Sequence, residues 1–372
     1  MKILKKCFFL FFFLFAGKLL AEDPKTLEIG ASAPDFNLPA TNGNNYSLKS
    51  FEKSAVLVIV FTCNHCPTAQ AYEERLKQLA TDYQSKGVAI VAVSPNDPLA
   101  VRLDELGYSD LGDSFEDMKI RAKDQNFNFP YLYDGETQEM SKKYGPAATP
   151  HVFIFDKNRK LQFNGRFDDA EKPGSVPKND DTRDALNAML AGKAVAVAKT
   201  KIFGCSVKWA DKRDWKQKGL EDWAKEPVNL DLIDEAGLKK LLKNDSDKLR
   251  LINVWATWCG PCVLEFPDFI TINRMYRGRD FEFIAISADK PDKKDKALSF
   301  LKKSQASNKN YLFNAPDIYK MIEIIDPNWQ GALPYTLLVE PGGKIVYAKQ
   351  GTINPQEMKK KIVENRLIGR VY

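Results

Sequence analysis

The sequence has little net charge outside its first residues. The chain of 372 residues carries 55 lysines and arginines against 49 aspartates and glutamates, a formal net charge of +6. Four of these lysines lie in residues 1–21, which contain no acidic residue, so the rest of the chain carries only +2. A charge so close to balance gives no reason to expect a nucleic-acid partner, and the lysine-rich stretch 290–296 is typical of a solvated loop or helix face.

Long apolar runs are also scarce. The longest, residues 7–17, is too short to span a bilayer comfortably. Lysines precede it and the small residue Ala21 follows it, which is the pattern of a secretory signal peptide. We therefore predict that residues 1–21 are a signal peptide and that the mature protein is periplasmic or secreted; an uncleaved membrane anchor is the alternative.

Cysteine is sparse as well. Beyond Cys7 in the predicted signal peptide, the cysteines are Cys63, Cys66, Cys205, Cys259 and Cys262. A disulfide across two intervening residues closes a very small loop and therefore stabilises the fold little, so stabilisation does not explain the presence of either CxxC pair. The pairs lie far apart in the chain and do not resemble a zinc ribbon or knuckle. Three uses remain open here: a single soft-metal site such as copper, a peroxide-reducing centre, or a dithiol that cycles with its disulfide.

The chain repeats one structural plan. The apolar runs 55–61 and 249–255 predict buried strands, each of which leads into a cysteine pair and then into a helical pattern. Farther on, residues 150–163 and 334–347 each predict an apolar hairpin that begins at a proline. A closing helix is predicted in each copy, at 182–190 and 355–365.

This repetition predicts two tandem α/β units, each with a central mixed sheet flanked by helices. We place the first unit, with the sequence CNHC, at residues 27–200 and the second, with CGPC, at 228–367. Residues 201–227 form the predicted connector, which contains Cys205. Three tryptophans of this stretch are expected to pack it against a unit, namely Trp209, Trp215 and Trp223.

The stretch WATWCGPC at 255–262, followed by Glu265 and by Leu333-Pro334, resembles the thioredoxin superfamily. It is similar in particular to the TlpA-like thiol-disulfide oxidoreductases, which are periplasmic or membrane-tethered and reduce clients such as apocytochrome c. The first unit opens with IGASAPDFNLPATNGNNYSLKSF at 29–51, which is similar to the start of the alkyl hydroperoxide reductase and thiol-specific antioxidant branch. Its active stretch and the later GCSVKW at 204–209 resemble a thioredoxin-family subgroup.

A helix start beside each leading sulfur would favour its thiolate. Cys63 and Cys259 are therefore the expected nucleophiles, and Cys66 and Cys262 are expected to resolve the mixed disulfide. In related families a GPC spacer accompanies a potential near about −270 mV and a histidine-containing spacer one near about −180 mV, so the second unit is expected to be the reductant. A protonated His65 would stabilise the Cys63 thiolate; the alternative is a solvent-facing histidine without a role.

Other residues are expected to support the sulfurs. Pro150 and Pro334 resemble the family's cis-proline, which lays a backbone edge beside the sulfurs for an extended client. Glu265 matches the acidic residue of the cytochrome-maturation branch and could take the proton from Cys262, or it could be a solvated helix residue. Cys205 could resolve a disulfide with Cys63 or be a buried apolar thiol. His151 could reach the dithiol or simply lie on a strand.

These expectations predict an extracytoplasmic thiol-disulfide oxidoreductase that acts on protein clients through both dithiols, without a cofactor. Its electron donor or acceptor, for example a membrane thiol transporter, is not specified by the sequence, and electrons could pass between the two units. A thiol peroxidase in the first unit is one alternative, although that family's pattern has a threonine three residues before the peroxidatic cysteine, whereas Thr62 adjoins Cys63. A carrier of soft metal at a CxxC pair is the other.

Overall fold

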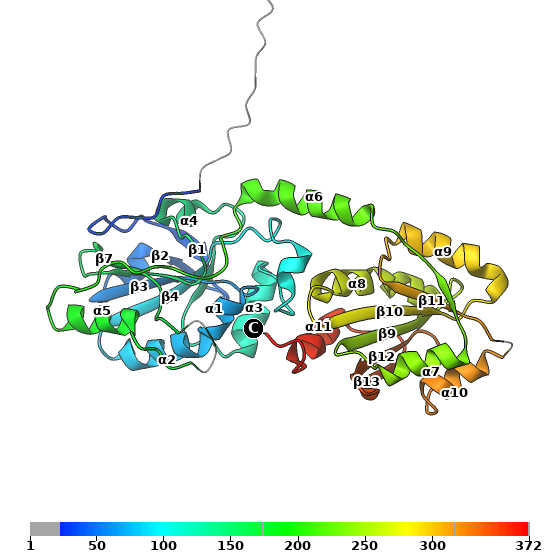
Figure 1. Cartoon of the computed structure of the whole chain (residues 1–372). Coiled ribbons are helices and arrows are strands. Elements are labelled where there is room, and N and C mark those ends of the chain that lie inside the picture. The colour runs from blue at the N-terminus through cyan, green and yellow to red at the C-terminus, as the bar shows by residue number, and fades with distance from the viewer. Residues whose placement is uncertain (1–22, 171, 173–174, 316, 371–372) are drawn as a thin grey trace, which may run out of the picture.

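The computed structural model describes residues 23–370, except residues 171, 173, 174 and 316. The predicted signal peptide, residues 1–21, lies outside the described residues. Two α/β units lie side by side, and helix α6 (Arg213–Ala224) runs between them along one side of the molecule (Figure 1). None of the described helices is long and apolar enough to cross a membrane.

The first unit is built on a five-stranded mixed sheet in the order β5-β4-β3-β6-β7. The central strand pairs in parallel with β4 and antiparallel to β6. The strands are β3 (Val56–Phe61), β4 (Val88–Ser94), β5 (Tyr131–Tyr133), β6 (His151–Phe155) and β7 (Leu161–Gly165), with a separate hairpin of β1 (Asn37–Pro39) and β2 (Asn45–Ser47). The helices are α1 (Pro67–Ala71), α2 (Glu73–Gln84), α3 (Phe115–Asp124), α4 (Glu139–Tyr144) and α5 (Asp181–Leu190).

The second unit is built on a six-stranded mixed sheet in the order β13-β12-β9-β10-β11-β8. Its central strand again has one parallel and one antiparallel neighbour, β10 and β12. The strands are β8 (Asp231–Ile233), β9 (Leu249–Trp255), β10 (Phe281–Ser287), β11 (Lys309–Phe313), β12 (Tyr335–Glu340) and β13 (Lys344–Gln350). The helices are α7 (Glu235–Lys243), α8 (Gly260–Tyr276), α9 (Lys294–Lys303), α10 (Tyr319–Ile325) and α11 (Pro355–Glu364).

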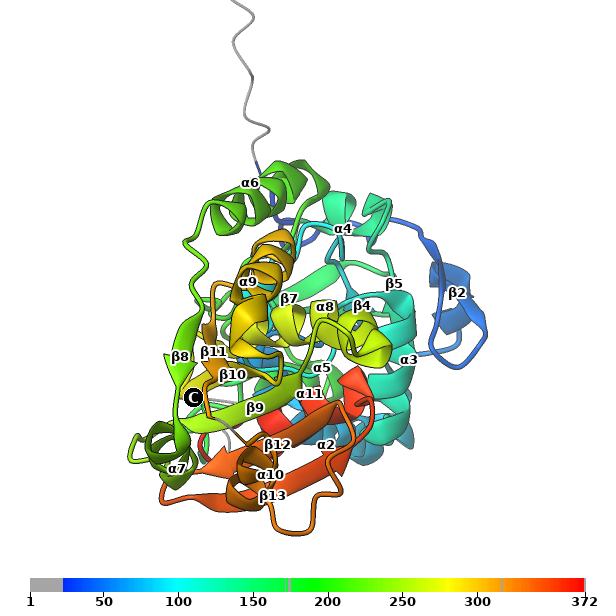
Figure 2. The same ribbon diagram turned by 90° about the vertical axis from the view of Figure 1, so that its right-hand side faces the viewer.

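Helices cover both faces of each sheet, so the central strands are largely apolar, although β9 contains the buried Arg250 and Asn253. Every residue of β3 and of β9 is buried. Successive side chains of a strand point to opposite faces, and in β3 Val58 belongs to one apolar cluster while Ile59 belongs to the other. In the second unit α8 and α9 lie on one face and α7 and α10 on the other (Figure 2). The prediction of two α/β units with central mixed sheets is confirmed.

The predicted connector divides into two parts. Its beginning lies on the first unit, where Cys205 pairs with Thr149, and only α6 runs on toward the second unit. Trp209 is buried, and Trp223 lies within 5.1 Å of the guanidinium of Arg274 in α8. Trp215 is 64% exposed, so the expectation that all three tryptophans pack against a unit is wrong for this one.

The two units meet along α11 and at the C-terminal end of α8. Tyr276 there donates a hydrogen bond from Oη to the carbonyl of Ser109 at 2.8 Å, and Arg279 donates one to the carbonyl of Gly107 at 2.8 Å. Cys259 caps the opposite end of this helix of 17 residues. At 1.5 Å per residue the helix is about 25 Å long, so this contact lies far from Cys259. A second contact lies nearer to the cysteine pair, because Gln356 of α11 donates to Asp110 at 3.2 Å and follows Ile353, which donates to Glu265.

Candidate functional site

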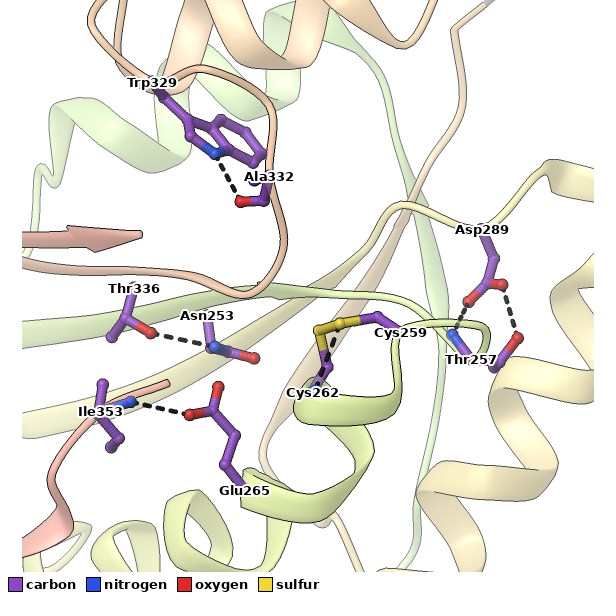
Figure 3. Close-up of a disulfide and its surroundings, with 10 residues drawn as sticks. All are labelled: Asn253, Thr257, Cys259, Cys262, Glu265, Asp289, Trp329, Ala332, Thr336 and Ile353. Carbon is purple, nitrogen blue, oxygen red and sulfur yellow. Dashed lines mark hydrogen bonds between the residues drawn. A yellow bond between two sulfur atoms is a disulfide. The ribbon is translucent and has the colours of Figure 1, made fainter. Parts of the chain in front are cut away.

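The second cysteine pair lies where β9 ends and α8 begins. Cys259 is the N-cap of α8, and its sulfur accepts a hydrogen bond from the backbone N–H of Cys262 at 3.3 Å. The two cysteines form a disulfide (Figure 3). This arrangement agrees with the expectation of a helix start beside Cys259, because the orphan N–H groups and the positive dipole end point at its sulfur.

The loop that carries Cys259 is held by Asp289, which follows β10. Its carboxylate accepts hydrogen bonds from the backbone N–H of Thr257 at 2.9 Å and from the Thr257 hydroxyl at 2.7 Å (Figure 3). Ser287 donates a further bond to the same carboxylate at 2.8 Å. Asp289 thereby positions the residues just before the cysteine. The sequence analysis missed it, since it is distant in the chain and belongs to no motif.

The loop before Pro334 forms the other side of this site. The Leu333-Pro334 and Thr149-Pro150 bonds are both cis, as predicted. Trp329 donates from Nε1 to the carbonyl of Ala332 at 2.9 Å (Figure 3). It also stacks on Tyr335, with ring centroids 4.6 Å apart. Trp329 and Tyr335 therefore fix the chain on either side of Pro334, a role that sequence reasoning did not assign to them.

Glu265 lies beneath the disulfide, three residues after Cys262 on the same helix. One carboxyl oxygen accepts a hydrogen bond from the Ile353 N–H at 2.9 Å. The other oxygen, Oε1, and the amide oxygen of Asn253 are both buried without a hydrogen-bond partner, and the two side chains lie side by side in Figure 3. A protonated Glu265 can donate to Asn253 and satisfy both atoms.

The ionisation of Glu265 agrees with this geometry. Burial raises the pKa of Glu265 from its ordinary 4.5 to about 7. The carboxyl group can therefore bind and release a proton near neutral pH, as a general acid or base requires. The alternative of a solvated helix residue is wrong, because the side chain is only 6% exposed.

Replacing Glu265 by glutamine is expected to stabilise the oxidised second unit at pH 8 by on the order of 1–3 kcal/mol, since the buried carboxylate is charged there and the amide is not. Because the native pKa is raised, the contribution of Glu265 to stability is fully present below about pH 4.5 and is lost as the pH rises to about 7. Urea unfolding at pH 4 and pH 8 measures this. The exposed Glu323→Gln serves as control, and an equal pH dependence in Glu265→Gln and wild type would contradict the prediction.

The first cysteine pair is arranged differently. Helix α1 begins at Pro67, and its N-cap is Cys66, whose sulfur accepts a hydrogen bond from the Ala69 N–H at 3.4 Å. The expectation that the helix start lies beside Cys63 is therefore wrong. The physical reason is Pro67, because proline favours the first helical position and disfavours a helical conformation in the residue before it.

This arrangement also changes which sulfur of the pair ionises first. Burial and the neighbouring Cys66 thiol raise the pKa of Cys63 well above its usual range, and the charge of Asp113 adds to this. Burial would raise the pKa of Cys66 too, but hydrogen bonds from the Cys205 and Cys63 thiols and the charge of His65 lower it overall. When neutral, Cys66 donates to the Thr149 carbonyl at 3.2 Å. His65 thus favours the thiolate of Cys66 rather than that of Cys63.

His65 is buried and paired with an aspartate far away in the sequence. Its Nδ1 lies 2.6 Å from Oδ2 of Asp113, and neither side chain is more than 2% exposed. Burial alone would lower the pKa of His65, but the charge and hydrogen bond of Asp113 raise it. The alternative of a solvent-facing histidine is wrong. Asp113 was not predicted, because nothing local in the sequence links it to the cysteines.

Asp113 also binds the backbone around the cysteines. It accepts hydrogen bonds from the N–H groups of Asn64 at 2.9 Å and His65 at 3.2 Å, and from the Asn96 amide at 2.7 Å. Atoms of Cys63, His65 and Asp113 lie within 4.8 Å of one another, which is a spacing that a metal ion could use. The His65 imidazole and the Asp113 carboxylate are hydrogen-bonded to each other, however, so we assign no metal ion to these three residues.

Sequence analysis left open whether His151 and Cys205 reach the first cysteine pair, and the structure answers differently for the two residues. His151 accepts at Nδ1 from the Ala147 N–H at 3.2 Å and bonds through Nε2 to Asn164 at 2.7 Å. Burial lowers its pKa to about 4, so it is a neutral residue of a strand, not a partner of the dithiol. Cys205, by contrast, packs against Cys63 and Cys66.

Comparisons with known proteins agree with this geometry. Residues 29–164 match the family model of the AhpC/TSA family, and residues 219–367 match that of Redoxin. The chain belongs to the thioredoxin superfamily. One relative of this thioredoxin-superfamily protein is the thiol-disulfide oxidoreductase ResA of Bacillus thuringiensis subsp. konkukian, 27% identical over 135 residues, which are 36% of this chain and 73% of the relative. Such relatives support an oxidoreductase.

Two solved structures are also similar in sequence. A hypothetical protein of Sinorhizobium meliloti 1021 is 35% identical, with a TM-score of 0.45, over 50% of this chain and 97% of its own. An uncharacterized conserved protein from Geobacillus kaustophilus is 38% identical, with a TM-score of 0.43, over 49% of this chain and 92% of its own.

Proposed function

We propose that this protein is an extracytoplasmic thiol-disulfide oxidoreductase whose second unit reduces disulfides of protein clients. The observation that carries the proposal is the Cys259–Cys262 disulfide at the start of α8, with the protonatable Glu265 beneath it. Trp258 is 67% exposed and Leu264 is 81% exposed, so apolar side chains flank the disulfide on the surface. Exposed apolar groups of this kind suit contact with a client.

The reaction proceeds by two exchanges of sulfur partners. In the reduced protein the Cys259 thiolate attacks a client disulfide, forms a mixed disulfide and releases one client thiolate, which takes a proton from water. Cys262 then loses its proton to Glu265 and attacks Cys259, which releases the second client thiol and leaves the Cys259–Cys262 disulfide. Two electrons pass to the client, and an outside dithiol must restore the protein.

The extracytoplasmic location is supported by the signal-peptide pattern of residues 1–21. In an oxidising compartment a reducing CGPC pair must be kept reduced by another dithiol, so we propose a membrane thiol transporter as the donor. Direct electron transfer between the two dithiols of one chain is not part of the proposal.

Insulin reduction driven by dithiothreitol tests the proposal. In the chain without residues 1–21, Cys259→Ser is expected to lower the rate about tenfold or more, because the attacking thiolate is lost. Thr271→Ser, elsewhere on α8, serves as the matched control. An unchanged rate in Cys259→Ser would overturn the proposal.

A thiol peroxidase in the first unit is the second candidate, favoured by the match to the AhpC/TSA family model. Two observations speak against it: Cys63 is only 2% exposed, and its pKa is raised rather than lowered. A peroxidatic cysteine needs an accessible thiolate. Peroxide consumption that is lost in Cys63→Ser would favour this candidate, whereas tight binding of copper(I) that is lost in the same variant would favour a soft-metal carrier.

A further inference from the structure

The backbone edge beside the first cysteine pair is occupied by the chain itself. The Thr149 N–H donates to the Cys205 carbonyl at 2.9 Å, and the Cys205 N–H donates back to the Thr149 carbonyl at 3.3 Å. The same Thr149 contacts both sulfurs, with Cys66 at 3.2 Å from its carbonyl and Cys63 at 3.2 Å from its hydroxyl. An extended client that added a strand at this edge would need these backbone groups.

The segment that pairs with Thr149 is fixed on both sides of Cys205. We call residues 198–209 the strap. On one side, the Ala198 carbonyl accepts a hydrogen bond from the Asn164 N–H at 2.9 Å. On the other side, the Lys208 N–H donates to Asn96 at 2.9 Å, and the Lys208 carbonyl accepts from the Gln138 amide at 2.9 Å. These bonds hold the strap against the first unit along its length.

The close approach of the strap depends on a glycine. Gly204 has a φ of +138°, and a Cβ at this position would lie 2.1 Å from the Thr149 carbonyl oxygen. A side chain there would collide with the backbone edge and would also be strained. Gly192 provides a comparison, because it too has a positive φ, +67°, but an added Cβ would meet no atom within 4 Å.

The strap places a third sulfur over the first cysteine pair. Cys205 packs against the cluster that Cys63 and Cys66 form with Ala69, and the neighbouring Cys66 thiol and burial raise the pKa of Cys205. Cys63 is 2% exposed and Cys66 is fully buried, whereas Cys205 is only partly buried. Of these three sulfurs, Cys205 is therefore the one that an outside thiol can reach.

We propose that the strap occupies the client-binding edge of the first unit, and that Cys205 forms a disulfide with Cys66 through which this unit exchanges electrons with outside dithiols. The inference rests on the proposed thiol-disulfide chemistry, but it assigns the outward-facing role in this unit to Cys205 instead of Cys63. It also explains why this unit has a cysteine outside its CxxC pair.

The exchange balances with an outside dithiol as reductant. One thiolate of that dithiol attacks the Cys205 sulfur, the Cys66–Cys205 bond breaks, and Cys66 leaves as a thiolate that the neighbouring His65 stabilises. In the mixed disulfide, one sulfur of the reductant is bonded to Cys205. The second thiolate of the reductant attacks that first sulfur and releases Cys205, which takes a proton. The reductant ends as a disulfide, and the protein gains two electrons and ends with two reduced cysteines. Attack of Cys63 on Cys66 would instead move the disulfide to Cys63–Cys66 and free Cys205.

Disulfide mapping tests the pairing. The full chain without residues 1–21 is reduced, oxidised with two equivalents of diamide, one for the thiols of each unit, and digested after alkylation, as wild type, Cys63→Ser and Cys63→Ser/Cys205→Ser. We expect a peptide pair linked by Cys66–Cys205 in wild type and in Cys63→Ser, and none in the double variant. The proposal is overturned if wild type gives only Cys63–Cys66 in this unit and Cys63→Ser gives no Cys66–Cys205 disulfide.

A second measurement tests the strap without altering a sulfur. Gly204→Ala is expected to raise the rate at which Cys63 and Cys66 are alkylated in the native reduced chain about tenfold, since the strap is displaced. Gly192→Ala is the matched control and should leave the rate unchanged. Equal rates in the two variants would overturn the role of the strap. Insulin reduction is measured on the same samples, so that a failure of the second unit's proposed activity is recognised separately.

Discussion

Replacing Asp113 by alanine is expected to destabilise the first unit by about 3–5 kcal/mol, because it leaves a buried histidine charge without its partner. His65 and Asp113 are almost completely buried and lie 2.6 Å apart. The change also removes the acceptor for the backbone N–H of Asn64 and for the amide of Asn96, and buried donors without partners add to the cost. The loop that carries both cysteines should therefore lose its fixed conformation.

Hydrogen exchange of the backbone amides in β3 and β4 measures this effect in the full chain, because it reports the unfolding of the first unit separately from that of the second. The control is Glu116→Ala, which breaks an exposed pair with Lys119 at the same distance of 2.6 Å and should change the stability by less than about 1 kcal/mol. Comparable effects of the two substitutions would show that the buried pair has no special role in the fold.

The central strands and hairpins of both units could be predicted because apolar pattern alone specifies them. The run predicted at 249–255 is β9 (Leu249–Trp255), and the run at 55–61 is β3 (Val56–Phe61). Strands that are covered by helices on both faces are apolar at most positions, and such runs stand out in a sequence of ordinary composition. In the second unit the helix start at Cys259 and the cis bond before Pro334 could also be predicted, because these residues belong to local motifs.

In the first unit, the prediction of the helix start beside Cys63 was wrong, although the sequence holds the information to correct it. The order of residues in CNHCP contains the information that Cys66 caps the helix, since the proline follows the second cysteine directly, whereas in CGPC it precedes the second cysteine. This difference moves the helix start from one cysteine to the other. It was overlooked because the two CxxC pairs were treated as equivalent.

The surroundings of the cysteines in the first unit could be predicted only in part. Cys205 was a candidate partner of Cys63, but Asp113 reaches the site only after the chain has folded and lies at no spacing that marks a motif. The same holds for Thr149, which pairs with Cys205 through backbone atoms that any residue possesses. Contacts of this kind depend on the tertiary arrangement and leave no periodic pattern in the sequence.

The position of the helix start leads to the second large expected effect, which concerns the thiolate of the first unit. In a reduced chain that carries Cys259→Ser and Cys262→Ser, an additional Cys63→Ser is expected to retain the ultraviolet thiolate absorbance at pH 7. An additional Cys66→Ser is expected to lower that absorbance about tenfold or more, because only thiols with raised pKa values remain. In this variant burial still raises the pKa of both Cys63 and Cys205, and the charge of Asp113 adds to this, so neither replaces the lost thiolate.

A titration of the absorbance against pH distinguishes this assignment from the one that the family pattern suggests. Serine at position 63 keeps a hydroxyl donor toward Cys66, so the pKa of Cys66 should stay below that of free cysteine, which is about 8.5. His65→Asn, added to Cys63→Ser, should raise it, since the positive charge beside the thiolate is removed. If the absorbance at pH 7 instead disappears with Cys63→Ser and persists with Cys66→Ser, then Cys63 carries the thiolate, and the helix that begins at Pro67 does not decide which sulfur ionises.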